Sequence, residues 1–299
     1  MAIFSRIVII GVGLIGGSVG LAARRGNIAD SVIGIDCRQD HLDIALQRGA
    51  VDYASTDFQT GILHLGYSSR RSARISTEAR LRPELIVAAV PVSKIAACLK
   101  DAAAVLDRFD DPRDFLLTDV GSTKSMICSQ FRDSRFIGSH PIAGSEKIGP
   151  AFSDENLFKN RIAVVTPSSH NKEVNVGLLV RFWQKLCSRV VCLSPEEHDT
   201  HLAKTSHLPH LVSSLLAETL EMRDKRYAGT GFRSTTRLAS GGPLMWRDVV
   251  CSNQAAVLNA VKGFEEILKT MRQQIEQSDW DGLTQTLESA KIKRDGLED

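Results

Sequence analysis

A glycine-rich segment near the start of the chain constrains the fold more than any other feature of the sequence. Residues 6–10 (RIVII) are almost continuously apolar and β-branched, as is typical of a buried parallel strand. Residues 11–18 (GVGLIGGS) follow with a GxGxxG pattern, and a helix is expected over residues 14–25. A strand, a glycine-rich turn and a helix in this order favour a dinucleotide-binding unit.

The glycines of this pattern have separate physical roles. Gly11 permits the tight turn, Gly13 lets the backbone approach a pyrophosphate, and Gly16 lets the helix pack against the strand. Leu14 and Ile15 begin the helix, whose amides and dipole would face the phosphates. The alternative interpretation is a glycine-rich strand–helix turn that binds no ligand.

The second predicted strand, residues 31–35, bears on the choice of nucleotide. It ends at Asp36, twenty residues after Gly16. A carboxylate at this position can accept hydrogen bonds from the adenosine ribose and repels a 2′-phosphate, so it favours NAD over NADP. Arg38 lies nearby in the sequence and keeps NADP open as an alternative. We therefore predict an NAD site that includes Asp36 and Arg38.

The composition narrows the range of partners and compartments. A net charge of +2 over 299 residues gives no reason to expect nucleic acid or a membrane as a partner. The apolar segment 7–23 contains five glycines, which suits a strand–turn–helix better than a membrane-spanning helix. The six cysteines are scattered without a CxxC pair, which argues against a zinc site or disulfides. We expect a cytoplasmic protein without a metal site.

The remaining pattern divides the chain into two predicted domains. Residues 194–197 (SPEE) have the serine, proline and glutamate of a helix start, and only helices are expected after them. The fold class is therefore α/β, with a Rossmann-like doubly wound sheet in residues 1–194 and an all-helical domain in residues 195–299. Before residue 194, strands alternate with helices, and further strands are expected at 84–93, 115–120, 161–167 and 189–193.

Residues 57–83 interrupt this alternation. We interpret the segment as an extended surface loop, with contact to phosphate as the alternative. Five arginines stand there among serines and glycines without apolar periodicity: Arg70, Arg71, Arg74, Arg80 and Arg82.

Several candidate functional residues follow predicted strands. The carboxyl ends of parallel strands form the ligand-binding edge of a doubly wound sheet. Val90 and Pro91 close one strand at this cofactor edge. Ser122 lies in DVGSTK (residues 119–124), after the next strand, where N-capping of a helix is the alternative role.

The segment SHPIAGSE (residues 139–146) carries the candidate general base. Pro141 fixes its own backbone and biases its neighbour toward extended geometry, so we predict a rigid, non-helical turn at His140. A histidine held there can act as a general base near neutral pH. The alternative is a solvated loop histidine without a catalytic role.

Taken together, these motifs resemble the prephenate/arogenate dehydrogenase family of tyrosine biosynthesis. The resemblance covers nearly the whole chain, and the GxGxxG is its least specific part. It implies an N-terminal Rossmann-like domain and a C-terminal all-helical domain that forms a homodimer. The specific motifs are DVGSTK, SHPIAGSE, SHLPH (residues 206–210), FRSTTRLA (residues 232–239) and MWRD (residues 245–248).

The resemblance also implies a role for individual residues. His140 would take the proton of the substrate's ring 4-hydroxyl while a hydride leaves C4 for NAD. Ser122 would orient this histidine and the hydroxyl, and Arg237 would hold a substrate carboxylate. An arginine suits that role because it stays charged and binds a carboxylate bidentately. The substrate pocket would also include His207, His210, Glu146 and Trp246.

The implied reaction is the oxidative decarboxylation of prephenate to 4-hydroxyphenylpyruvate. Loss of the ring carboxylate as CO2 restores aromaticity, so positioning of the reactants is the protein's main task. Arogenate, which has an ammonium where prephenate has a keto group, is the alternative substrate. A histidine at position 210, rather than an acid, favours the keto substrate. After the two domains are counted, no regulatory or chorismate mutase segment is expected.

Two rival functions remain open at this point. A β-hydroxyacid dehydrogenase has a similar domain order, but its candidate catalytic lysine, Lys262, lacks the expected surroundings. An NAD-sensing regulatory protein would bind the nucleotide without turning over a substrate. A prephenate or arogenate dehydrogenase requires His140, Ser122 and Arg237 to converge on one cleft beside the nicotinamide, whereas a sensor does not.

Overall fold

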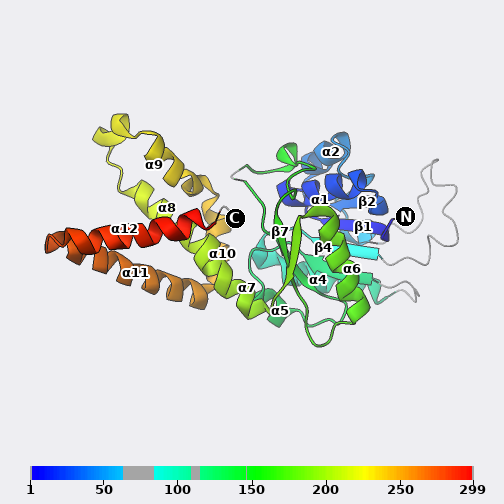
Figure 1. Ribbon diagram of the computed structural model, residues 1–299. Helices are drawn as coiled ribbons and strands as arrows, with labels where there is room; N and C mark the ends of the chain where they lie inside the picture. The colour runs from blue at the N-terminus through cyan, green and yellow to red at the C-terminus, as the bar shows by residue number, and fades with distance from the viewer. Residues whose placement is uncertain (1, 63–83, 109–114, 146, 298–299) are drawn as a thin grey trace.

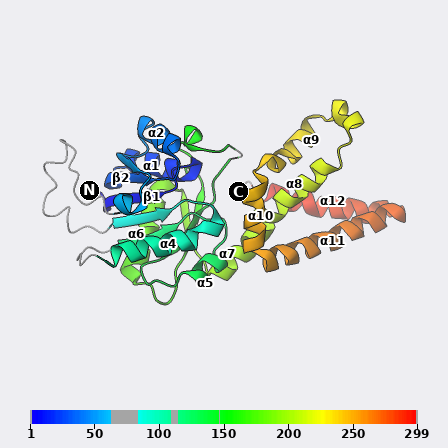
Figure 2. The same ribbon diagram turned by 180° about the vertical axis from the view of Figure 1, so that it is seen from behind.

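The computed structural model describes residues 2–62, 84–108, 115–145 and 147–297, which form an α/β part and a helical part (Figure 1). Residues 63–83, with the five arginines interpreted as a surface loop, lie outside the described residues, and so does Glu146. The two parts lie side by side, and the helical part extends away from the sheet in both views (Figure 2).

A five-stranded parallel sheet forms the centre of the α/β part, in the order β3-β2-β1-β4-β5. The central strand β1 is apolar on both faces, because Ile7 and Ile9 pack into one core cluster and Val8 and Ile10 into another. The strands are β1 (Phe4–Ile10), β2 (Ala29–Ile35), β3 (Tyr53–Ser55), β4 (Glu84–Ala88) and β5 (Phe115–Asp119).

Helices cover both faces of this sheet. Helices α1 and α6 contribute Val19, Phe182 and Trp183 to the first core cluster, whereas α4 contributes Ile95 and Leu99 to the second. The doubly wound α/β prediction is therefore confirmed. The helices are α1 (Leu14–Arg25), α2 (Gln39–Gln47), α3 (Phe58–Ile62), α4 (Val92–Leu106), α5 (Ser125–Gln130) and α6 (Glu173–Leu186).

Helix α3 corrects the prediction of an extended loop from residue 57 onward. Ile62 is buried in the second core cluster, and a Cβ on Gly61 would lie 2.5 Å from the Ile35 side chain. This burial against the sheet stabilises a helical turn that the local composition did not indicate.

A second sheet carries His140. Strand β6 (Gly138–Pro141) is antiparallel to β7 (Ile162–Thr166), which is parallel to β8 (Arg189–Cys192). His140 pairs with Val164, so the predicted turn is wrong, and His140 lies in a strand. The extended geometry expected before Pro141 is nevertheless present, and a proline is tolerated because β6 is at the edge of its sheet.

Only helices and turns occur in the described residues after 194. Helix α7 begins with the predicted capping box: the Ser194 hydroxyl accepts from the Glu197 amide at 3.1 Å, and the Glu197 carboxylate accepts from the Ser194 amide at 2.8 Å. The helices are α7 (Pro195–Leu202), α8 (Leu208–Glu218), α9 (Thr230–Thr235), α10 (Pro243–Ser252), α11 (Gln254–Glu276) and α12 (Trp280–Asp295).

Helix α10 connects the two parts. It packs against α4, with Val249 buried in the second core cluster of the α/β part. The Ser93 hydroxyl at the start of α4 donates to the Asp248 carboxylate at 2.8 Å, and the Thr123 hydroxyl donates to Ser252 at 2.9 Å. Among the described helices, none is both long and apolar enough to cross a membrane.

Candidate active site

The glycine-rich turn has the shape required for a dinucleotide. Gly11 has a φ of 91°, and a Cβ there would lie 2.5 Å from the carbonyl oxygen of Ala89, so only glycine fits. At Gly13, by contrast, a Cβ would meet no atom within 4 Å. Gly13 precedes α1, and the first helical residues Leu14 and Ile15 are partly exposed. The helix N-terminus therefore faces open space that a pyrophosphate can approach.

Asp36 is fixed beside this turn, as predicted for a ribose-binding acid. One carboxylate oxygen accepts from the Val12 amide at 3.1 Å, and the other accepts from the Arg38 amide at 3.0 Å. The Arg38 guanidinium is directed to Asp40, with 3.1 Å between Nε and Oδ1. The backbone amides thus orient the Asp36 carboxylate at the end of β2, where 10% of the side chain is exposed.

Val90 and Pro91 follow β4 at the same edge of the sheet. Val90 is half-buried, and Pro91 is exposed at the start of α4. The adjacent strand β5 ends just before Ser122, so the predicted cofactor residues and DVGSTK share the carboxyl ends of neighbouring parallel strands. These residues fit NAD in the manner expected of a Rossmann-like edge.

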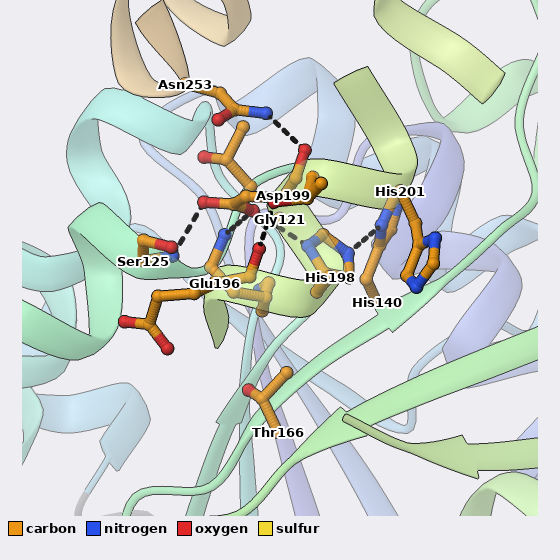
Figure 3. A network of polar contacts seen from close by, with 12 residues as sticks. Gly121, Ser125, His140, Thr166, Glu196, His198, Asp199, His201 and Asn253 are labelled. Carbon is orange, nitrogen blue, oxygen red and sulfur yellow. Dashed lines mark hydrogen bonds and ion pairs between the residues drawn. The ribbon is translucent and has the colours of Figure 1, made fainter. Parts of the chain in front are cut away.

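His140 ends a hydrogen-bonded row that crosses between the two parts of the chain (Figure 3). Its Nδ1 lies 2.9 Å from Nε2 of His198 in α7, and Nδ1 of His198 lies 2.8 Å from Oδ1 of Asp199. An ionised carboxylate only accepts, so Nδ1 of neutral His198 carries the proton and Nε2 of His198 accepts from His140. Neutral His140 therefore holds its proton on Nδ1, and its Nε2 has an available lone pair.

Asp199 is held ionised by several donors. Its carboxylate accepts from the backbone amides of Lys124 at 2.7 Å and Ser125 at 2.9 Å, at the start of α5. Burial raises the pKa of Asp199, but the hydrogen bonds from His198 and from these amides outweigh burial and leave that pKa below its ordinary value. The charge on Asp199 in turn maintains the tautomers of His198 and His140.

A buried ion pair supports the strand of His140. The Lys124 ammonium pairs with Asp119 and donates to the carbonyl of Ser139 at 2.9 Å, and both charged side chains are fully buried. The Asp119 carboxylate also accepts from the Ser139 amide at 3.1 Å. Burial, followed by the neighbouring histidines and the Lys124 charge, lowers the pKa of His140 well below its ordinary value. His140 is therefore neutral at pH 7, as a general base must be.

The histidines of SHLPH lie where the two parts meet. His210 stacks on Trp246 with 3.7 Å between ring centroids, and His207 lies edge-on to the same indole at 6.2 Å. A π-turn (Ala203–His207) precedes α8, and the Leu208 amide donates to the carbonyl of Ala203. Such turns are frequent at functional sites. Both histidines are buried, and burial lowers the pKa of His207 to about 4 and lowers that of His210.

Ser122 lies beside this group. It is half-buried, and its backbone is close enough to His207 to influence the pKa of that histidine. Within the described residues, His140 bonds to His198, and no hydrogen bond joins it to Ser122. The structure thus brings Ser122 to the site of His140 and His207, while its orienting role stays a prediction.

Arg237 approaches the same region from another element. It begins a 3₁₀ turn (Arg237–Ser240), is exposed, and precedes Leu238, whose backbone influences the pKa of His210. Glu146, the remaining predicted pocket residue, lies outside the described residues. Lys262, which the rival β-hydroxyacid dehydrogenase function would need, is exposed on α11.

Sequence reasoning missed His198 and Asp199 as residues of the site, and it missed the burial of Lys124. The adjacent His198 and Asp199 follow the recognised capping box, and a His–Asp pair one turn into a helix was the available signal. Lys124 is the last residue of the DVGSTK motif, but no local pattern indicated its complete burial. In the described part of the chain, no three His, Cys, Asp or Glu side chains form a metal-binding group.

The fold and the site together define a dinucleotide-dependent dehydrogenase with a helical second domain. Two family models cover most of the sequence: the nucleotide-binding domain of prephenate dehydrogenase matches residues 19–192, and its dimerization domain matches residues 194–289. The chain belongs to the prephenate dehydrogenase family, which confirms the resemblance seen in its motifs.

Relatives and solved structures agree with this assignment. The prephenate dehydrogenase of Bacillus subtilis is 32% identical over 97% of this chain and 76% of its own length. The cyclohexadienyl dehydrogenase of Zymomonas mobilis is 27% identical over 98% of this chain and 96% of its own length. The structure of Aquifex aeolicus prephenate dehydrogenase with hydroxyphenyl propionate and NAD+ has a TM-score of 0.84, with 28% identity over 98% of both chains. Synechocystis arogenate dehydrogenase gives 0.74, with 25% identity over 98% of this chain and 99% of its own.

Proposed function

We propose that this protein is an NAD-dependent prephenate dehydrogenase, which converts prephenate to 4-hydroxyphenylpyruvate and CO2 in tyrosine biosynthesis. The observation that carries the proposal is the row Asp199–His198–His140, which leaves a neutral histidine with an available Nε2 beside the cofactor edge. The family and the names of its relatives in Bacillus subtilis and Aquifex aeolicus support prephenate as the substrate.

The reaction removes a proton from the 4-hydroxyl of the substrate and a hydride from C4, so it requires one acceptor for the proton and another for the hydride. Bound NAD supplies the hydride acceptor. His140 Nε2 takes the proton of the 4-hydroxyl, and the positive charge that develops on its ring is stabilised through His198 by Asp199. Asp36 and the Gly13 turn would hold the nucleotide, and Ser122 follows a neighbouring strand at the same edge of the sheet. The developing ring carbonyl and the loss of CO2 then yield the aromatic product.

Substrate anchoring uses the groups that gather between the two parts. Prephenate carries two carboxylates, and Arg237 offers a bidentate partner for one of them. Neutral His207 and His210 offer hydrogen bonds without a second fixed charge, and Trp246 provides an apolar wall. Ser122 orients the hydroxyl near His140. Glu146 completes the proposed set from the segment after β6.

Arogenate remains the second candidate substrate, because an arogenate dehydrogenase of Synechocystis is among the structural neighbours. The two substrates differ where prephenate has a keto group and arogenate an ammonium. The buried His210, whose pKa burial lowers, presents no negative charge to pair with an ammonium. Prephenate is therefore preferred.

A homodimer built by the helical domain is part of the proposal. Large apolar side chains are exposed along three of its helices, and such a surface is typical of a subunit interface. The proposed domains are residues 1–194 and 195–299, and the six free cysteines suit the reducing cytoplasm. The exposed apolar residues include Leu215 in α8, Leu258, Ile267, Leu268 and Ile275 in α11, and Leu287 and Ile292 in α12.

The test is nicotinamide reduction by the purified protein, with NAD or NADP and with prephenate or arogenate in parallel. We expect rapid NAD reduction with prephenate. Reduction with arogenate alone would retain the family and reject the interpretation of His210. NAD binding without reduction by either substrate would favour the sensor function.

A further inference from the structure

Asn253 connects the catalytic row to the substrate histidines. It lies between α10 and α11 and is buried, with 7% of its surface exposed. Its side-chain nitrogen donates to the backbone carbonyl of Asp199 at 2.8 Å and lies 3.3 Å from Nδ1 of His207. Figure 3 shows Asn253 at the far end of the row that runs through Asp199 and His198 to His140.

The chemistry of these contacts fixes the orientation of the Asn253 amide. A backbone carbonyl only accepts, so the group that faces Asp199 must be the NH2 and not the oxygen. The same NH2 has a second hydrogen, which is directed to His207. Because an amide NH2 donates and does not accept, Nδ1 of His207 must be the acceptor in this contact.

The proton of neutral His207 is consequently on Nε2. Burial lowers the pKa of His207 to about 4, so the ring is neutral at pH 7. Among the described residues, fully buried Nε2 has no partner within hydrogen-bond geometry, although the Ser122 backbone lies near enough to raise the pKa of His207. The ring is next to Trp246, and it is also one of the groups that act on the pKa of His140. A buried N–H donor that no described residue accepts from in good geometry thus lies at the edge of the proposed substrate site.

We propose that Asn253 is a positioning residue that holds His207 as the Nε2–H tautomer, a neutral donor for an oxygen of the anionic substrate. The inference rests on the proposed function, because it assigns the buried donor to the substrate of that site. Asn253 also holds the Asp199 backbone, so one amide sets the tautomer of the substrate histidine and supports the row that ends at the base.

The first test reads the tautomer directly in the full-length protein. Histidine ¹⁵N resonances are recorded at pH 7, and the His207 signals are assigned by their loss in His207→Gln. We expect the pattern of a protonated Nε2 and an unprotonated Nδ1. A protonated Nδ1 would overturn the proposal. This readout needs no turnover, so it decides the tautomer even if the protein oxidises neither prephenate nor arogenate.

The second test separates a positioning role from a purely structural one. His207→Gln keeps an NH2 donor in place of the imidazole but no longer depends on a tautomer. Asn253→Ala should lower kcat/KM for prephenate about tenfold in the wild-type background and by a clearly smaller factor in His207→Gln, where only the contact to the Asp199 carbonyl is lost. An equal loss in both backgrounds would overturn the proposal. Unfolding of Asn253→Ala, seen by circular dichroism, would leave the decision to the tautomer measurement on the wild type.

Discussion

Nε2 of His198 lies 2.9 Å from Nδ1 of His140, and this contact joins strand β6 of the α/β part to helix α7 of the helical part. The proposed base and the residue that fixes its tautomer therefore come from different domains. Asp199 in the same helix accepts from the amides of Lys124 and Ser125, so α7 is held against the α/β part. The hydrogen bond that prepares Nε2 of His140 is thus fixed by contacts from both parts of the chain.

The acidic limb of the pH–rate profile should lie below pH 6.5. Burial and the positive Lys124 lower the pKa of His140, so the base stays neutral as the pH falls through the range of an ordinary histidine. The double variant Asp119→Asn/Lys124→Met removes both buried charges and should move the limb of kcat/KM upward, toward pH 6.5. Lys185→Met, on the exposed face of α6, is the control and should leave the limb in place. An unmoved limb in the double variant would reject the electrostatic role of Lys124.

The stability of the protein should fall as the pH decreases from about 6.5 to about 4. The pKa of His207 is about 4 in the folded protein and near 6.5 when unfolded, so the unfolded state binds more protons in this window. This histidine alone should account for a loss of about 3 kcal/mol. Urea unfolding of His207→Gln should show a shallower pH dependence than the wild type, whereas the exposed His170→Gln should match it. Parallel curves for wild type and His207→Gln would contradict the assignment.

Gly13→Ala should separate folding from nucleotide binding. A Cβ at Gly13 meets no atom within 4 Å, so we expect a folded protein that is at most about 1 kcal/mol less stable. The methyl group would occupy the approach of the pyrophosphate and should raise Kd for NAD roughly tenfold or more. Isothermal titration gives this Kd, and Gly177→Ala in α6, where space is equally open, is the matched control. Unchanged affinity in Gly13→Ala would place the phosphates elsewhere.

Arg237 should govern substrate binding rather than the chemical step. Loss of a charge-assisted contact to a carboxylate should make Arg237→Ala raise KM for prephenate roughly 10- to 100-fold, with kcat changed much less. Arg237→Lys keeps the charge without the bidentate geometry and should fall between wild type and Arg237→Ala. Arg233, whose Nε lies 3.3 Å from the Ala228 carbonyl, provides the control variant Arg233→Ala. A fall in kcat at constant KM would assign Arg237 a different role.

The parts of the fold that depend on local chemistry were predictable. The β-branched strand and the glycine pattern that follows it predicted a tight turn and a helix. The structure has both, with a positive φ at Gly11 and α1 beginning after Gly13. The capping box of Ser194 and Glu197 lies within four residues and formed as expected. The family motifs then pointed to His140, because a short motif contains both the histidine and the proline that extends its backbone.

The parts that depend on distant partners could not be read locally. His140 lies in a strand because β7, more than twenty residues later, supplies its hydrogen-bond partners. Ile62 is helical because sheet and helix side chains from other segments bury it. His198 gains its role only when α7 meets β6, and Asn253 gains its role only when the start of α11 meets α7. Each of these contacts joins segments whose pairing no local pattern specifies.

The most direct test of the account is the rate of NADH formation by His140→Asn with saturating prephenate and NAD. The asparagine amide can still donate to His198, so the row is retained while the base at Nε2 is removed. We predict that kcat falls by roughly 10²- to 10⁴-fold, that KM for prephenate and NAD stays within about threefold, and that the exposed His170→Asn behaves as the wild type. An unchanged kcat in His140→Asn would contradict the assignment of His140 as the base.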